Sequence, residues 1–82
     1  MNKVFSVNFA VNSIYGSFDK VVALFAKEEN AAQFLHNAVE KTTKSLQEKG
    51  YVKVFNLTQK VKFENPESGE YELYYLQEWE VK

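Results

Sequence analysis

The side chains of this chain that could carry out catalysis or bind a metal ion are few. There is one histidine, His36, and no cysteine among the 82 residues. A nucleophile–base pair or a usual zinc site would need a second histidine or a cysteine beside it. His36 follows Leu35 on a predicted helix, ~100° round from the apolar stripe, so we expect an exposed surface residue. The single aspartate, Asp19, lies near a predicted turn.

Glutamates are abundant, and a pair of carboxylates can hydrolyse a glycosidic bond. No pair is set apart by its spacing, however, and we expect most of them to be surface partners of lysines. The sequence also contains no P-loop, GxGxxG, HExxH or GxSxG pattern. We therefore predict a protein that is not an enzyme, and we expect no cofactor, no metal ion and no small-molecule substrate.

The composition is that of one small globular domain, covering residues 1–82. Hydrophobic residues make up 45% of the chain and charged residues 26%, which is too apolar for a disordered segment. No apolar run approaches the ~20 residues that cross a bilayer, and the N-terminal stretch alternates without a cleavage pattern. We expect a cytoplasmic protein without membrane contact.

The ten basic residues are all lysines, balanced by 11 acidic residues to a net charge of −1. Arginine is the usual reader of guanine and phosphate, so its absence argues against a nucleic-acid partner. One alternative is a single-stranded nucleic-acid-binding domain, in which Tyr74 stacks on bases while Lys53, Lys60 and Lys62 contact phosphates. Another is an acidic DNA-mimic inhibitor that uses the glutamates of the C-terminal strand, namely Glu70, Glu72, Glu78 and Glu80.

The N-terminal part of the chain predicts a hairpin. Residues 3–11 alternate, with Phe5, Val7, Phe9 and Val11 on one side, as in a strand with one buried face. Residues 12–17 resemble a turn. Residues 18–26 fit either a strand or a helix, and we favour a strand because one helix from 17 to 49 would be ~50 Å long.

Residues 28–49 predict a long amphipathic helix. Its apolar stripe contains Ala31, Leu35, Ala38, Thr42 and Leu46, widened by Phe34 and Val39. Glu28 and Glu29 suit the positive end of the helix dipole, and Lys44 and Lys49 the negative end. Gly50 can adopt the left-handed conformation just beyond the helix.

Residues 51–63 and 71–81 predict two further strands joined by the turn Asn65-Pro66-Glu67-Ser68-Gly69. The odd positions of the last strand are the more apolar ones. We therefore pair Phe63 with Tyr71, Val61 with Leu73 and Phe55 with Trp79. This register predicts a buried face made by Tyr71, Leu73, Tyr75, Trp79 and Val81.

The predicted fold is α+β with the order β-β-α-β-β. It has a four-stranded, mainly antiparallel sheet with one long helix packed on one face. The order of the two hairpins in the sheet stays open. The second-ranked fold is βααββ, in which residues 18–26 are helical.

One helix covers only one face of such a sheet, so the opposite face is expected to be open. Val52, Val54, Tyr74 and Leu76 fall on that face by parity, and contiguous exposed apolar surface usually marks an interface. A bulge of the third strand near Asn56 would instead turn Val52 and Val54 inward. Ile14 and Tyr15 at the first hairpin tip either fold back onto the core edge or anchor a partner.

From these features we predict a small non-enzymatic protein-interaction module. Its partner is another protein or a second copy, with a homodimer expected, and Val52, Val54, Tyr74, Leu76, Ile14 and Tyr15 are the candidate contact residues. A small domain without a catalytic set would suit a phage or mobile-element accessory protein that acts on a host protein.

Overall fold

The computed structural model describes residues 2–57 and 59–81. Over these ranges the chain forms five strands and one helix, in the order β1 (Asn2–Ser13), β2 (Gly16–Phe25), α1 (Glu28–Glu48), β3 (Val52–Leu57), β4 (Lys60–Glu64) and β5 (Tyr71–Val81). The predicted α+β class is confirmed. The predicted number of four strands is wrong, because residues 51–63 form two strands instead of one. Thr58, which that predicted strand contained, lies outside the described residues.

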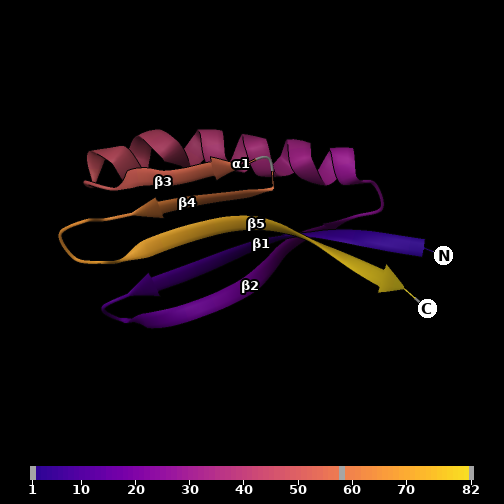
Figure 1. The fold of residues 1–82 in the computed structure, drawn as a ribbon, viewed down its shortest axis with the longest axis horizontal. Helices are drawn as coiled ribbons and strands as arrows, with labels where there is room; N and C mark the ends of the chain where they lie inside the picture. Colours follow the sequence, from indigo (N-terminus) through magenta and orange to yellow (C-terminus); the bar gives the residue numbers. More distant parts are fainter. Residues whose placement is uncertain (1, 58, 82) are drawn as a thin grey trace.

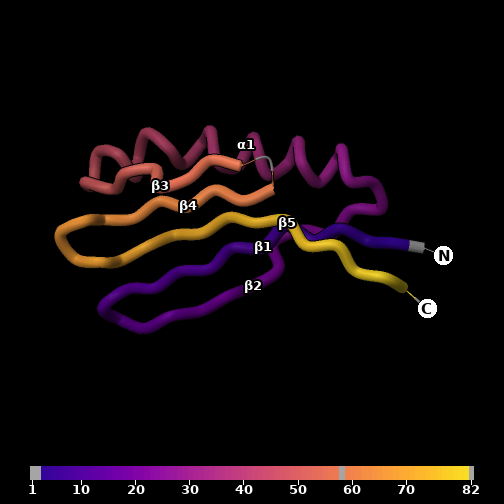
Figure 2. The backbone as a smooth tube through the Cα atoms, in the orientation of Figure 1, coloured from indigo at the N-terminus to yellow at the C-terminus, as the bar shows by residue number. Residues whose placement is uncertain are grey.

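The five described strands form one antiparallel sheet in the order β2-β1-β5-β4-β3. The first and last strands of the chain are therefore neighbours at its centre, which the sequence left open. Figure 1 shows the sheet with α1 running along the side where β3 lies, and Figure 2 shows β1 and β5 crossing near the end that carries both termini.

The β1–β2 hairpin confirms the strand prediction for residues 18–26, and the helical alternative is wrong. Its pairs run from Ser13–Gly16 at the turn to Phe5–Phe25, with a bulge in β2 opposite Val7 and Asn8. The β-branched and aromatic residues of this segment favour an extended backbone once a partner strand is available. β2 is an edge strand, and most of its side chains are exposed.

Helix α1 begins and ends close to its predicted bounds. Glu28 and Glu29 occupy its first turn, and the N-cap position, Lys27, makes no side-chain capping bond. The last turn contains no basic residue, because the helix ends at Glu48 and Lys49 is already the C-cap. Gly50 follows with φ +91°, the left-handed conformation that the sequence predicted for it.

The β4–β5 register differs by one residue from the prediction. Phe63 pairs with Glu72 and Val61 with Tyr74, whereas the prediction paired each with the residue one place earlier. Glu64–Tyr71 is the last pair before the β4–β5 connection. The backbone N–H of the next residue, Asn65, donates to the carbonyl oxygen of Glu70 (2.8 Å) and so closes the connection. A slip of one residue exchanges the two faces of a strand.

The core lies on the side of the sheet that carries Phe63 and Val7, which we call the core face. Its fully buried apolar side chains come from α1, β1 and β4, namely Phe5, Val7, Ala31, Leu35, Val39, Leu46, Val61 and Phe63. Tyr74 and Leu76 of β5 pack against this cluster. The predicted core residues of β5 instead lie on the opposite side, which we call the second face: Tyr71, Leu73, Tyr75, Trp79 and Val81.

Candidate functional site: the second face of the sheet

The second face is ordered in rows of residues that pair across the strands. One row runs through Asp19 on β2, Ala10 on β1, Leu73 on β5, Lys62 on β4 and Phe55 on β3. Paired residues of an antiparallel sheet point to the same side. The row therefore has an acidic end, an apolar centre and a basic flank.

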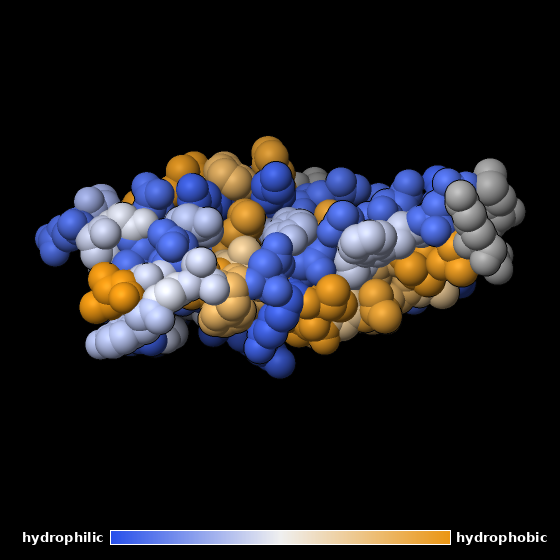
Figure 3. Space-filling model, turned by 90° about the horizontal axis from the view of Figure 1, so that it is seen from below, coloured by the Kyte–Doolittle hydropathy of each residue, from blue (hydrophilic) through white to orange (hydrophobic). Residues whose placement is uncertain are grey.

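Apolar side chains continue on both sides of this row. Tyr71 and Tyr75 flank Leu73 along β5, and all three are partly buried. Towards the termini, Trp79 is 46% exposed and Leu24 64% exposed. Figure 3 views the molecule from the β2 edge, where hydrophobic side chains form a band towards the end that carries the termini. Exposed apolar side chains from both β2 and β5 therefore lie on the second face.

Three contacts engage the charged side chains of the row. The Tyr75 hydroxyl donates to Asp19 Oδ2 at 2.6 Å, and this bond is the main reason that the pKa of the Tyr75 hydroxyl is raised. On the other flank, the Lys62 ammonium lies 4.6 Å from the centre of the Tyr71 ring and 3.7 Å from Glu64 Oε1. The charges therefore stand beside aromatic rings on the same face.

A buried polar cluster lies under the tryptophan. Ser6 and Asn8 are 0% and 2% exposed, although both point to the second face. The Ser6 Oγ accepts hydrogen bonds from Trp79 Nε1 (2.8 Å) and Asn8 Nδ2 (3.1 Å). The Trp79 indole is thus held by a hydrogen bond to the neighbouring strand β1, with part of its surface left exposed.

Two of the predicted contact residues are not where the sequence placed them. Tyr74 and Leu76 lie on the core face, where the Tyr74 ring is 4.7 Å from that of Phe9 and 6.5 Å from that of Phe63. The physical reason is the one-residue register shift. These two residues are therefore not part of an open apolar face.

The remaining predicted contact residues are exposed. Val52 and Val54 of β3 are about half exposed, and a bulge falls between Lys53 and Phe55, close to the position considered from the sequence. Ile14 and Tyr15 are 76% and 93% exposed. They do not fold back onto the core edge, and the hairpin tip is instead tied by its backbone, because the Ile14 N–H donates to Glu70 Oε2 at 3.2 Å.

The residues of the nucleic-acid alternative are not brought together. Lys60 and Lys62 lie on the second face, whereas Tyr74 and Lys53 lie on the core face, with the Lys53 ammonium over the Phe63 ring. Three glutamates of the DNA-mimic alternative, Glu72, Glu78 and Glu80, lie on the same side of β5, which is the core face. Glu72 is partly buried on the core face, and Glu78 pairs with Lys3 at 3.3 Å.

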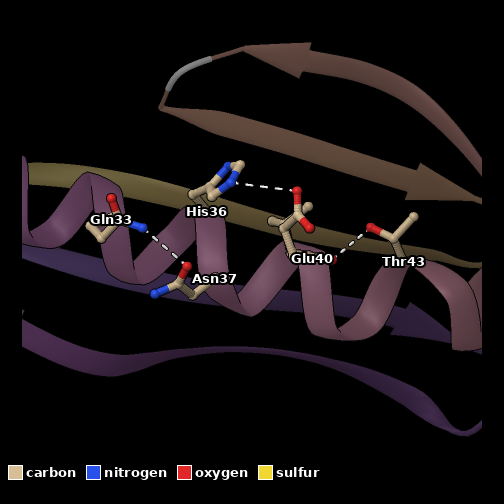
Figure 4. A network of polar contacts seen from close by, with 6 residues as sticks. Gln33, His36, Asn37, Glu40 and Thr43 are labelled. Atoms are coloured by element: carbon tan, nitrogen blue, oxygen red, sulfur yellow. Dashed lines mark hydrogen bonds and ion pairs between the residues drawn. The ribbon is translucent and has the colours of Figure 1, made fainter.

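His36 is exposed on α1, as predicted, and its Nε2 lies 3.4 Å from Glu40 Oε1. Figure 4 shows both side chains on the side of the helix that faces the β3–β4 hairpin. Within residues 2–57 and 59–81, no group of three or more His, Cys, Asp or Glu side chains is placed to hold a metal ion.

The chain matches no family model, no curated protein and no solved structure. In the described part of the chain, no helix has the length and apolar character needed to cross a bilayer.

Sequence reasoning missed the residues that make the second face. Apolar residues occupy both faces of β5, with Tyr74 and Leu76 among the even positions, so the choice of the buried face depended on the hairpin register. The sequence did not indicate that Ser6 and Asn8 are buried, because polar side chains on a strand normally face solvent. Their position on β1, between β2 and β5 and opposite Gln77 and Tyr75, could not be foreseen without the strand order.

Proposed function

We propose that this protein is a non-enzymatic interaction module that forms a homodimer through its second face. The observation that carries the proposal is the row Asp19–Ala10–Leu73–Lys62–Phe55, with charges of opposite sign on the two sides of an apolar centre. Interfaces between identical copies related by a two-fold axis need a surface that is complementary to itself.

A two-fold axis that runs along β5, between two facing sheets, satisfies this condition. It places Leu73 against Leu73 of the partner subunit and turns β2 of one copy over the β3–β4 side of the other. Neighbouring strands are ~4.8 Å apart, so Asp19 lies ~10 Å from the axis and Lys62 ~5 Å on the other side. The flexible lysine stem spans that difference, and each Asp19 then meets a lysine of the other copy.

In this assembly α1 shields the core face of the sheet and the second copy shields the second face. The solvent-accessible surface area of the single chain supports the proposal that a second copy covers the second face. It is 5703 Å², compared with about 5,000 Å² for a compact monomer of 9.5 kDa. The apolar residues of the second face would account for part of this excess.

The test is the molar mass in solution, measured by light scattering behind a sizing column over a hundredfold range of concentration. We expect wild type to be a dimer. Asp19→Lys and Lys62→Glu should each weaken dimerisation at least tenfold, because each brings like charges together across the interface. The double variant should dimerise again, because it restores opposite charges in the reversed order.

Matched controls are Lys41→Glu on the exposed side of α1 and Glu67→Lys in the β4–β5 connection, which carry the same charge changes away from the second face. Both should dimerise like wild type. A monomeric wild type at every concentration would exclude the dimer. Single variants that both dimerise like wild type would exclude this face as the interface.

A further inference from the structure

The tip of the β1–β2 hairpin presents two large side chains that are not part of the core. Ile14 and Tyr15 are 76% and 93% exposed. Their backbone is nevertheless fixed, because the Ile14 N–H donates to Glu70 Oε2 at 3.2 Å and the Tyr15 N–H donates to Ser13 Oγ at 3.2 Å. A fixed backbone loses little conformational freedom on binding, and tyrosine is common among the residues that dominate interface energies.

A half-exposed valine lies across the second face at the same end of the sheet. The row of paired residues next to the tip contains one residue from each strand, namely Ser17, Asn12, Tyr71, Glu64 and Val52. Figure 1 shows the β1–β2 turn and the β4–β5 connection together at this end of the molecule, away from both termini. Val52 is 51% exposed and is the first residue of β3. It therefore ends the row on the side opposite β2.

The two-fold axis of the proposed dimer brings the two ends of this row together. Rotation about an axis along β5 keeps each residue at its level along the strands and exchanges the two sides of the sheet. β2 of one copy then lies over β3 of the other, since both are two strands away from β5. Ser17 faces Val52 of the partner subunit, where the small serine leaves space beside the valine. Asn12 faces Glu64 of the partner subunit, and its amide can donate to that carboxylate.

We propose that the Ile14–Tyr15 tip of each copy clasps the start of β3 in the other copy, with Tyr15 against Val52 of the partner subunit. The tip follows the pair Ser13–Gly16, which is one pair beyond Ser17. Neighbouring pairs are ~3.4 Å apart along a strand, so the tyrosine side chain reaches back to the level of Val52. This contact rests on the proposed dimer, occurs twice in it because the axis is two-fold, and determines its orientation.

A two-fold axis across the strands would place the tip elsewhere. Such an axis, along the row through Leu73, would turn β2 of one copy over β2 of the other. Asp19 would then face Asp19 of the partner subunit, and the tip would lie over the Leu24 end of β2. Like charges that face each other across an interface disfavour that arrangement. The charges of the second face therefore favour the orientation in which the tip meets β3.

Chemical crosslinking tests the contact, because the chain contains no cysteine of its own. Tyr15→Cys and Val52→Cys are made as single variants, mixed, and treated with a short bis-maleimide that spans the ~10 Å between packed sheets. We expect a covalent dimer from the mixture. Neither variant alone should crosslink, because the two copies of each position lie on opposite sides of the axis. Tyr15→Cys mixed with Lys41→Cys, on the exposed side of α1, measures random collision and should also stay uncrosslinked.

Two further measurements separate failure of the clasp from failure of the dimer. Light scattering shows whether wild type is a dimer, and Leu73→Cys, which lies beside the axis in either orientation, should crosslink to itself. A monomeric wild type would overturn the dimer and the clasp together. A dimer in which Leu73→Cys crosslinks but Tyr15→Cys and Val52→Cys do not would overturn the clasp alone. Crosslinking of Tyr15→Cys to Leu24→Cys would do the same.

The dissociation constant of the dimer gives an independent readout. Tyr15→Ser and Val52→Ser should each raise it at least tenfold. The double variant should raise it by less than the product of the two single effects, because both changes remove the same contact. Single effects that multiply in full would show that the two residues act separately, and this result would contradict the clasp.

Discussion

At the scale of single residues, the least expected group is the Ser6 hydroxyl. It is fully buried and accepts hydrogen bonds from the Trp79 indole and the Asn8 amide. A sequence pattern shows Ser6 only as the polar position of an alternating strand. Its burial follows from two features of the fold: β1 is paired on both sides, with β2 and β5, and Trp79 donates a hydrogen bond to Ser6 from above it.

We predict that Ser6→Ala lowers the free energy of unfolding by about 1–3 kcal/mol, because the buried Asn8 amide and the partly buried Trp79 N–H lose their acceptor. The emission of Trp79, the only tryptophan in the chain, should also shift as its N–H loses this partner. Urea unfolding followed by fluorescence measures both effects. Ser45→Ala on the exposed side of α1 is the control and should change stability by less than about 0.5 kcal/mol. Equal stability of Ser6→Ala and wild type would contradict the role of the hydroxyl.

A second residue-scale prediction concerns Glu72, which the register shift brings to the core face. Burial raises the pKa of its carboxyl group, while the Lys49 charge and the Tyr74 hydroxyl act in the opposite direction. The folded state thus binds the proton more tightly than the unfolded state does. The free energy of unfolding should therefore decrease as the pH rises from the usual carboxyl range through the raised pKa.

Glu72→Gln removes this titration. We expect the variant to be more stable than wild type at pH 7, with a difference that shrinks towards pH 4, where the wild-type carboxyl is increasingly protonated. Urea unfolding of both proteins from pH 4 to pH 8 measures the difference. Glu67→Gln in the exposed connection should keep the wild-type profile. Lower stability of Glu72→Gln at pH 7 would show that attraction to Lys49 outweighs the cost of burial.

At the scale of elements, local signals were sufficient for the helix, for the turn of the β1–β2 hairpin and for the turn between β4 and β5. The apolar stripe of α1, the strand alternation of β1 and the left-handed Gly50 all follow from short-range chemistry. Local signals were not sufficient to decide which face of β5 is buried. Tyr71, Leu73 and Tyr75 point to one face and Tyr74 and Leu76 to the other, so both faces offer apolar side chains to the core. The observed register is determined by the hydrogen bonds of the β4–β5 connection and by the pairing of β5 with β1. The second of these is a contact between segments that are distant in the sequence.

The break between β3 and β4 was also missed. Residues 51–63 contain no glycine or proline, so they carry none of the strongest turn signals. As a consequence, Phe55 pairs with Lys62 and not with Trp79. The same reversal places β3 at the edge of the sheet.

The end of α1 allows an element-scale prediction. Gly50 has φ +91°, and the nearest atom to an added Cβ would be Asn65 Nδ2 at an ordinary 3.7 Å. The cost of Gly50→Ala is therefore conformational and should be about 1–2 kcal/mol. Gly50→Asn should cost less, because asparagine tolerates the left-handed region. Thermal unfolding followed by circular dichroism would rank the three proteins, and equal losses for Ala and Asn would point to crowding instead.

At the scale of the whole molecule, the chain is elongated, with extents of 45 × 24 × 16 Å. Its radius of gyration is 13.5 Å, compared with about 11.7 Å for a compact domain of this length. The two long central strands account for this shape, because they extend past the short strands β3 and β4 (Figure 1). Length and composition predicted a single small domain but contained no information on its shape.

The shape and the proposed dimer together predict a stability that depends on protein concentration. Association that occurs only in the folded state raises the thermal midpoint as concentration increases. We expect the midpoint of wild type to rise over a hundredfold concentration range, and that of Lys62→Glu to rise much less. Scanning calorimetry at several concentrations measures this directly. A wild-type midpoint that stays constant would speak against association linked to folding.

The pairing of β1 with β5 also has a consequence for how the chain folds. These strands lie side by side at the centre of the sheet, yet a contact between them, from Trp79 to Ser6, joins residues 73 positions apart. The β1–β2 hairpin and the helix can form from local contacts, but β5 is synthesised after the helix and the other four described strands. Closing so long a loop costs entropy before any contact stabilises it, and this slows folding. Until β5 docks, the inner edge of β1 stays open, so a newly made chain can pair there with another chain.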